Sequence, residues 1–177
     1  MGKLTAAQKR FRKNAVIITA RQAVYTALIG RYKDGVSIEI IAEVVTKGTT
    51  PKTYGFGFVE DGIPFLRVED VLDGKVNYEE AIYSIDEKTH DFMSRSKTKS
   101  GDVLITIAGS IGRAAVIPPN APELNMNQAV ALIRCKDTVD PYYLCHIIQS
   151  LGIQQQVVNS TVSSAISNLS LGNIKKL

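Results

Sequence analysis

The sequence predicts an α+β protein: a mixed α/β domain with a twisted sheet of short strands, preceded by a long amphipathic helix. Two observations lead to this class. Short apolar runs bounded by Gly, Pro and polar residues recur at 63–68, 103–107, 114–117 and 129–134, and such runs are typical of buried strands. Residues 4–29 instead carry apolar side chains at a spacing of three to four, which is typical of one face of a helix.

Composition is that of an ordinary folded domain. Of the 177 residues, 45% are hydrophobic and 21% are charged, values usual for globular proteins. No apolar run approaches the roughly 20 residues that span a bilayer, so no transmembrane segment is expected. The two cysteines, Cys135 and Cys145, do not make a disulfide framework, and we expect a reducing, cytoplasmic location.

Positive charge is concentrated in the N-terminal arm. The net charge is +4, but residues 1–33 carry eight basic side chains and no acid, whereas the other 144 residues carry 13 basic and 17 acidic groups. The overall charge is therefore no argument for nucleic-acid binding, and only local patches are. Three interpretations of the arm stay open: a targeting presequence, a membrane-surface helix, and a helix that packs on its own domain or on a partner. We favour the packing helix.

Local patterns predict the elements of the first half of residues 34–177. Residues 36–45 form an apolar segment that fits either a strand or a short helix, because periodicity does not separate the two. After it we expect, in order, a loop over 46–57, a strand over 63–68, a turn at Asp73-Gly74, a short helix within 84–93 and a basic loop over 94–101.

The second half alternates strands with loops and ends in helices. The apolar run 103–107 leads into Gly109-Ser110-Ile111-Gly112, which predicts a strand followed by a tight turn. Asp140 before Pro141 predicts a helix start, because Asp caps an N-terminus and Pro suits the first turn. The side chains expected on its buried face are Tyr143, Leu144, Ile147, Ile148 and Leu151. A hydroxyl-rich loop over 160–168 and a final helix from about Leu171 complete the prediction.

Motifs that suggest catalysis fail on their context. Gly55-Phe56-Gly57 resembles the glycine turn of methyltransferases, but a polar loop precedes it instead of a buried strand. Asp140-Pro-Tyr-Tyr143 lacks the second proline of the Asp-Pro-Pro-Tyr loop that binds a target amine. The Cys145-His146 pair does not have zinc-site spacing, and Ser110 lacks the flanks of a nucleophile elbow. We therefore expect no catalytic residue, no metal and no cofactor.

Loops rich in Lys, Arg, Ser, Thr, Asn and Gln carry the chemistry that remains. The first four side chains suit phosphate oxygens, and Arg, Asn and Gln suit base edges. Candidates for phosphate contact are Lys47, Thr49, Thr50, Lys52, Arg95, Lys97 and Lys99. Candidates near base edges are Tyr54, Ser110, Arg113, Asn127, Gln128, Ser163 and Ser164. For Asn127 and Gln128 an alternative stays open, in which they brace the backbone of neighbouring strands.

Six segments together resemble one family of DNA readers. In order they are Lys47-Gly-Thr-Thr-Pro51, Gly62-Ile-Pro-Phe-Leu-Arg-Val-Glu-Asp70, Gly101-Asp-Val-Leu-Ile-Thr-Ile-Ala-Gly-Ser-Ile-Gly-Arg113, Asn125-Met-Asn-Gln-Ala129, Asp140-Pro-Tyr-Tyr-Leu144 and Ile166-Ser-Asn-Leu-Ser-Leu171. Taken as an ordered set, they make the chain resemble a target recognition domain of the specificity subunit of type I restriction–modification systems. The Trp usual near the start of that domain is missing, and the segment around Val36 takes its place.

The resemblance implies a non-catalytic reader of double-stranded DNA over residues 34–177, with 171–177 as the start of a further helix. Residues 1–33 look like the end of a conserved spacer helix, which docks the modification methyltransferase subunit. The restriction nuclease subunit then joins the complex, and no membrane partner is implied. Since one recognition domain is about half a subunit, the resemblance implies either a fragment or a half-subunit, and for a half-subunit we expect a homodimer through the N-terminal helix. Two alternatives stay open: a helical assembly module without DNA reading, and the recognition domain of a fused methyltransferase–nuclease.

Overall fold

A four-stranded antiparallel sheet forms the centre of residues 36–177. The computed structural model describes residues 35–162 and 168–177, so the expected N-terminal helix over 1–33 lies outside the described residues. The strands of the central sheet are β1 (Ala42–Lys47), β4 (Val103–Thr106), β5 (Ala114–Val116) and β7 (Val130–Cys135), in the order β1-β7-β4-β5. Each neighbouring pair runs antiparallel.

A second, smaller sheet packs on one face of the central sheet, opposite to the face that the helices cover. Its strands are β2 (Ile63–Leu66), β3 (Ser84–Ile85) and β6 (Asn125–Met126), in the order β3-β2-β6. β2 pairs with β3 antiparallel and with β6 parallel. Three 3₁₀ turns lie near these strands: η1 (Pro51–Tyr54) between β1 and β2, η2 (Val68–Asp70) between β2 and β3, and η3 (Ser94–Ser96) before β4.

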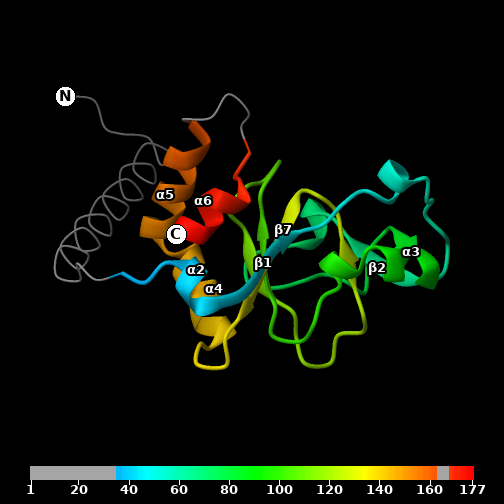
Figure 1. Ribbon diagram of the computed structural model, residues 1–177, viewed down its shortest axis with the longest axis horizontal. Coiled ribbons are helices and arrows are strands. Elements are labelled where there is room, and N and C mark those ends of the chain that lie inside the picture. Colours follow the sequence, from blue (N-terminus) through cyan, green and yellow to red (C-terminus); the bar gives the residue numbers. More distant parts are fainter. Residues whose placement is uncertain (1–34, 163–167) are drawn as a thin grey trace, which may run out of the picture. The chain divides into compact units, whose positions relative to one another are not determined.

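The helices gather in two places. Four of them, α2 (Ile38–Ile41), α4 (Pro141–Gln149), α5 (Leu151–Val162) and α6 (Leu171–Lys176), cover one face of the central sheet, whereas α3 (Glu87–Phe92) lies beside the small sheet (Figure 1). α2 and α6 lie side by side: Ile38 and Ile174 are buried in the same core cluster, and Lys175 Nζ lies 3.5 Å from Glu39 Oε1. The mixed helices and strands confirm the expected α+β class.

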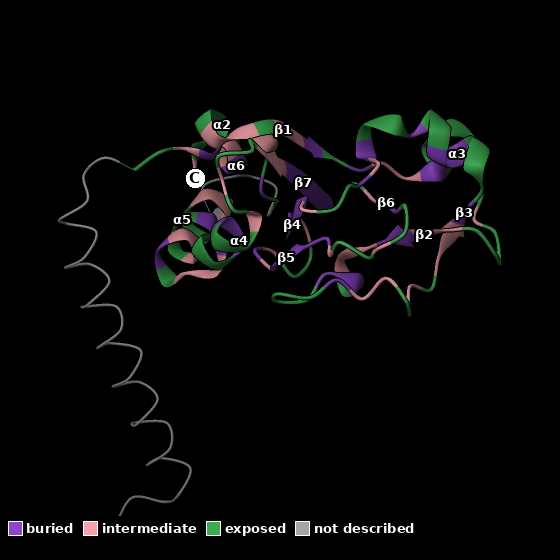
Figure 2. Cartoon of the chain, turned by 90° about the horizontal axis from the view of Figure 1, so that it is seen from below, coloured by how far each residue is buried: buried purple, intermediate pink, exposed green. Residues whose placement is uncertain are grey.

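The central sheet is buried on both faces, which explains the uninterrupted apolar runs in its strands. Val103 and Ile105 of β4 pack toward the helices, and Leu104 between them packs toward the small sheet. β7 alternates in the same way, with Ile133 on the helix side and Leu132 on the other. In Figure 2 the centre of the sheet is accordingly coloured as buried. Hence neither face of this sheet is open to a ligand, and only the loops at its ends are.

Local signals at helix ends are confirmed. The Asp140 carboxylate accepts hydrogen bonds from the backbone N–H of Tyr142 at 2.7 Å and of Tyr143 at 3.2 Å, and Pro141 occupies the first turn of α4. Ser170 caps α6 by accepting from the N–H of Asn173 at 3.0 Å. The predicted final helix from Leu171 is therefore confirmed as well.

Two segments of the first half differ from expectation. Residues 36–45, which fit strand or helix, form both: a single turn of α2 followed by β1. The loop expected over 94–101 is only partly exposed, because Ser96 and Thr98 are buried against the small sheet. Serines and threonines among lysines therefore do not mark a solvated loop here.

The C-terminal half holds two corrections. Leu144 and Ile148 of α4 are buried as expected, but Tyr143 and Ile147 of α4 are exposed, and Leu151 is exposed at the start of α5. Both sets fit helical spacing, and the helix packs on the sheet through the stripe that also contains Cys145. The loop expected from residue 160 is also wrong at its start, because α5 continues to Val162. Within the described residues, no helix is long and apolar enough to cross a membrane.

Candidate nucleic-acid interface

The strand register brings three predicted clusters to one end of the central sheet. Lys47 at the end of β1 pairs with Ala131, and Thr106 at the end of β4 pairs with Val130. The C-terminal ends of β1 and β4 therefore lie beside the N-terminal end of β7. The segments that leave or enter the sheet here are 47–50, 109–113 and 127–128, which we call the polar loops.

Two of the polar loops are joined by their backbones. Gly48 donates its N–H to the Val130 carbonyl at 3.2 Å, and Thr49 donates to the Met126 carbonyl at 3.3 Å. The Thr50 hydroxyl adds a bond to Gln128 Oε1. A Cβ at position 48 would lie 1.9 Å from the Met126 carbonyl oxygen, so only glycine permits this approach.

The third polar loop is a turn that hydrogen bonds to the buried Thr106 hydroxyl stabilise. Gly109 and Gly112 have φ of 71° and 91°, left-handed values that favour glycine. The buried Thr106 hydroxyl donates to the Ser110 carbonyl and accepts from the N–H of Arg113 at 3.0 Å. The Ser110 side chain is exposed at the tip of the turn, and Arg113 is half-buried at its base.

Helix α5 supplies a support for this turn that the sequence did not reveal. Gln154 Nε2 donates to the Gly112 carbonyl and to the Ile148 carbonyl, each at 2.8 Å. One amide thus ties the turn to the junction between α4 and α5. Because Gln154 and Gly112 lie 42 positions apart, no local pattern could have indicated the contact.

Asn127 makes a local hydrogen bond within its own loop, so whether it contacts DNA or braces neighbouring strands stays a prediction. Its Oδ1 accepts from the N–H of Ala129 at 3.0 Å, while its side chain stays half-exposed. Asn125, two residues earlier, is fully buried. Its Oδ1 accepts from the Ser96 hydroxyl at 2.6 Å and its Nδ2 donates to the Met93 carbonyl at 3.3 Å. Asn125 therefore fixes η3 against β6 and faces no ligand.

The basic loop divides into two parts. Arg95 is exposed, and Lys97 pairs with Asp91 of α3 at 2.5 Å. Lys99 lies at the other end of the central sheet, because its N–H donates to Asp102, the residue before β4 begins. The structure therefore brings together Lys47, Thr49, Thr50, Ser110, Arg113, Asn127 and Gln128, with Lys52 and Tyr54 following in η1. It does not bring Lys99 to them.

A buried ion pair fixes the base of the basic loop. Asp102, only 1% exposed, accepts from Arg134 Nε at 2.8 Å and from Arg134 Nη2 at 2.7 Å. The hydrogen bonds from Arg134 to Asp102, opposed in part by burial, raise the pKa of the guanidinium above its ordinary value. Arg134 Nη2 also reaches the Lys97 carbonyl at 3.5 Å. This guanidinium is therefore structural.

His90 of α3 is also buried, and burial lowers the pKa of its imidazole below the ordinary 6.5. Its Nδ1 lies 3.2 Å from Asn125 Nδ2, so the neutral ring can accept a hydrogen bond there. Its Nε2 lies 3.3 Å from Glu123 Oε2 without hydrogen-bond geometry. The histidine is thus part of the packing under α3.

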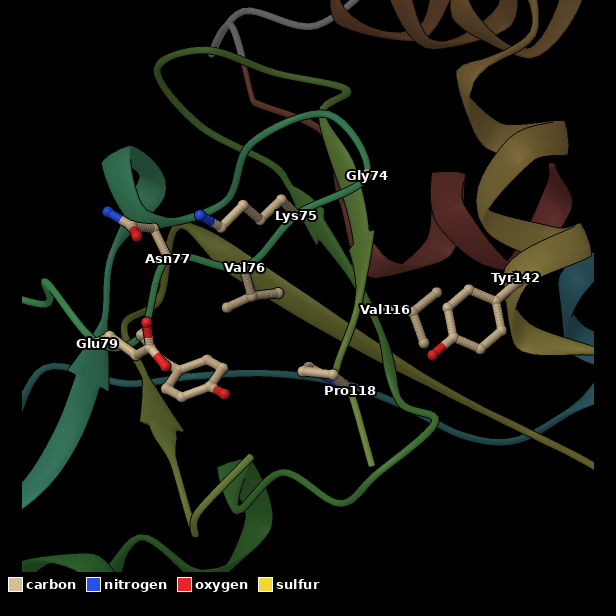
Figure 3. A pocket seen from close by; sticks show the side chains of 9 residues that line it. Gly74, Lys75, Val76, Asn77, Glu79, Val116, Pro118 and Tyr142 are labelled. Carbon is tan, nitrogen blue, oxygen red and sulfur yellow. The ribbon is translucent and has the colours of Figure 1, made fainter. Parts of the chain in front are cut away.

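The described residues offer no arrangement for bond-making chemistry. They contain no group of three His, Cys, Asp or Glu side chains placed to hold a metal ion. Gly55 is the left-handed C-cap of η1, with φ of 80°, and does not follow a strand. A pocket of about 230 Å³ lies beside β5; Val76 and Val116 line it from opposite sides of this strand, and Tyr142 lies next to Val116 (Figure 3). No convergent set of catalytic side chains lines it.

Comparison with known proteins gives the family. A family profile described as "Type I restriction modification DNA specificity domain" matches residues 33–177. The chain belongs to this family. The type I specificity subunit of the EcoBI restriction enzyme of Escherichia coli is a curated member, 30% identical over 120 residues, which are 66% of this chain and 24% of that one.

Solved structures share the fold of this type I specificity domain. The HsdS subunit from Thermoanaerobacter tengcongensis aligns over 97% of this chain and 41% of its own, with a TM-score of 0.57 and 13% identity. A chain from a structure on complex assembly and conformational transition of the type I R-M system aligns over 97% and 43%, with a TM-score of 0.60 and 15% identity. This chain therefore spans less than half the length of each of these relatives. The candidates Ser163 and Ser164 lie outside the described residues.

Proposed function

We propose that residues 34–177 are a non-catalytic reader of a DNA sequence within a type I restriction–modification complex. The observation that carries the proposal is the gathering of the three polar loops at one end of a sheet that is buried on both faces. A rigid sheet with polar loops at one end suits base and phosphate contact. Family membership supports the same function.

The side chains of the polar loops and of the adjoining η1 fall into two groups, one suited to phosphates and one suited to base edges. Lys47 and Lys52 are exposed and have no acidic partner among residues 35–162 and 168–177, so their charge is available to phosphates. Ser110, Arg113 and Gln128 present donors and acceptors that suit base edges. Ser163 and Ser164 remain candidates on their sequence alone.

Partners and location follow from the family. We propose that the chain acts with a modification methyltransferase subunit, which carries the chemistry on adenine, and with a restriction nuclease subunit. Residues 1–33 are the proposed docking helix, and a homodimer through it would supply a second recognition domain. Such a complex works where the chromosome lies, in the cytoplasm.

Co-expression with the adjacent methyltransferase subunit tests the proposal directly. Mapping methylated adenines in the host DNA should give one sequence motif, and that motif should disappear when residues 34–177 are deleted. Methylation without any motif would contradict sequence reading, and an unchanged motif after the deletion would assign the reading to another chain.

A charge variant tests the placement of DNA at the polar loops. Lys52→Ala should reduce the slope of log affinity against log salt by about one unit, because one phosphate contact is lost. Lys136→Ala is the matched control, since Lys136 lies just past the far end of β7 and its Nζ donates to the Ile40 carbonyl at 2.7 Å. Equal slopes in the two variants would show that DNA does not bind at this end.

A further inference from the structure

Three aromatic rings form an exposed cluster next to the polar loops. The ring centroids of Tyr54 and Phe92 lie 5.0 Å apart at an interplanar angle of 62°, and those of Phe56 and Phe92 lie 5.1 Å apart at 51°. Tyr54 is 51% exposed and Phe92 is 55% exposed. Exposed apolar groups held in contact with one another mark interaction sites more often than scattered ones do.

The rings are held rigidly by two separate elements. Tyr54 ends η1, whose last turn closes with the N–H of Gly55 donating to the Lys52 carbonyl at 3.2 Å. Phe92 ends α3, which begins at Asp86, whose carboxylate accepts from the N–H of Thr89 at 2.7 Å. A contact made by either ring therefore costs little backbone entropy, because η1 and α3 are already formed and capped.

Charge around the cluster fits a polyanion. Lys52 of η1, Lys88 of α3 and Arg95 of η3 are exposed and lie in the elements that carry or adjoin the rings. Of the acids on or beside α3, Asp91 is paired with Lys97 and Asp86 caps the helix, which leaves Glu87 and Glu123. The cluster is also continuous with the polar loops, because Thr50, bonded to Gln128, directly precedes η1.

We propose that the Tyr54–Phe56–Phe92 cluster is an apolar contact to nucleobases of the DNA target, with Phe92 as the contacting ring. This inference rests on the proposed function and extends it from Tyr54, already a candidate, to Phe56 and Phe92, which the polar motifs do not include. Aromatic rings contact bases either by packing on the methyl group of thymine or by inserting next to an unstacked base. Both need an exposed ring, and cationic side chains beside it would hold the phosphates of the same nucleotides.

Removal of the ring tests the contact. In the full chain bound to its methyltransferase subunit, Phe92→Ser should weaken binding to the mapped target duplex about tenfold, in the range expected for one aromatic–base contact. The slope of log affinity against log salt should not change, because no phosphate contact is lost. Phe92→Leu, which keeps apolar bulk, should lose less. Thermal melts should match wild type, since Phe92 is largely exposed.

Fluorescence gives a second measurement that does not depend on the loss of function. The chain contains no Trp, so Phe92→Trp introduces a single reporter at the proposed contact. We expect its emission to be quenched when target duplex is added. Tyr143→Trp is the matched control, because Tyr143 is 66% exposed on α4, on the other side of the central sheet (Figure 1), and it should not respond.

The outcomes separate the alternatives. Replacing each thymine of the target in turn by deoxyuridine removes only its methyl group. If one replacement weakens the affinity of wild type but not that of Phe92→Ser, the ring contacts that methyl group. If no replacement weakens the affinity of wild type, the ring inserts next to a base. Unchanged affinity in Phe92→Ser, or unchanged emission from Phe92→Trp on addition of the duplex, overturns the inference while leaving DNA reading intact. Loss of the methyltransferase subunit from Phe92→Ser overturns it too, because the cluster then contacts a protein partner. Absence of sequence-selective binding by the wild-type complex rejects the proposed function as well.

Discussion

A single methyl group at position 48 tests whether the polar loops support one another. In Gly48→Ala the new Cβ would lie 1.9 Å from the Met126 carbonyl oxygen and 2.3 Å from that of Asn127. Carbon–oxygen contacts in proteins begin at about 3.3 Å, so the backbones must separate by about 1.4 Å. Gly48 does not have a positive φ, and the expected effect is therefore steric alone.

The separation breaks the hydrogen bonds that join the two loops. These are the bonds from Gly48 N–H to Val130, from Thr49 N–H to Met126 and from Thr50 to Gln128. At about 1 kcal/mol each, their loss lowers the free energy of unfolding by about 3 kcal/mol. For a chain of this length the melting temperature should fall by about 6–12 °C. Circular dichroism melts measure the shift, and target affinity should fall with it.

Gly57→Ala is the matched control. A Cβ at position 57 would meet no atom within 4 Å, and Gly57 also lacks a positive φ. This variant should therefore melt within about 2 °C of wild type, in line with surface substitutions generally. Equal melting temperatures for Gly48→Ala and Gly57→Ala would show that the loops do not approach each other closely and do not act as one surface.

Three further predictions follow from single contacts. Gln154→Leu should weaken target affinity, because the turn around Gly112 loses its support, and should lower the free energy of unfolding by about 2 kcal/mol, because two hydrogen bonds are lost. Gln155→Leu, a change at an exposed position on the same helix, should not weaken affinity, and equal affinities would refute this role. Asp102→Ala should lower the free energy of unfolding by about 3 kcal/mol in denaturant titrations, because it leaves Arg134 without its buried partner; a change below about 1 kcal/mol would show that the pair is replaceable. Burial lowers the pKa of His90, so the unfolded chain takes up the proton more readily than the folded one. The stability that the neutral ring contributes is therefore lost as the pH falls below about 6.5. Unfolding measured from pH 7.5 to 5.5 should show that loss in wild type and a smaller one in His90→Gln.

Sequence patterns predicted those elements whose signals are local. The strand β4 follows from its apolar run, because a sheet buried on both faces needs apolar side chains at every position. α4 follows from Asp140 and Pro141, which act within one turn. β3 and β6 were missed because two residues carry no periodicity. The extent of α5 was missed because its Gln, Ser and Thr residues give only a weak apolar stripe.

The candidate site could be predicted in its parts and not in its assembly. Residues such as Lys47 and Ser110 are visible as polar residues beside apolar runs. Their proximity depends on the register of β1 and β4 against β7, which is fixed by contacts between residues far apart in sequence. The same reason explains why Lys99, which is close to other candidates in the sequence, lies at the opposite end of the sheet from the polar loops. Phe92 of the proposed base contact was not among the candidates, because an aromatic residue at a helix end is ordinarily assigned to the core.

The contact between α2 and α6 bears on how the domain can be exchanged between proteins, in evolution or by design. Since these two helices are neighbours, a longer chain would enter the domain and leave it at one place. Such a domain can be exchanged as a cassette without moving the segments on either side. Replacing one cassette by another with different loops would change what is read while the host architecture stays the same. Joining α6 to α2 with a short Gly-Ser linker and opening the chain in an exposed loop should likewise preserve the fold.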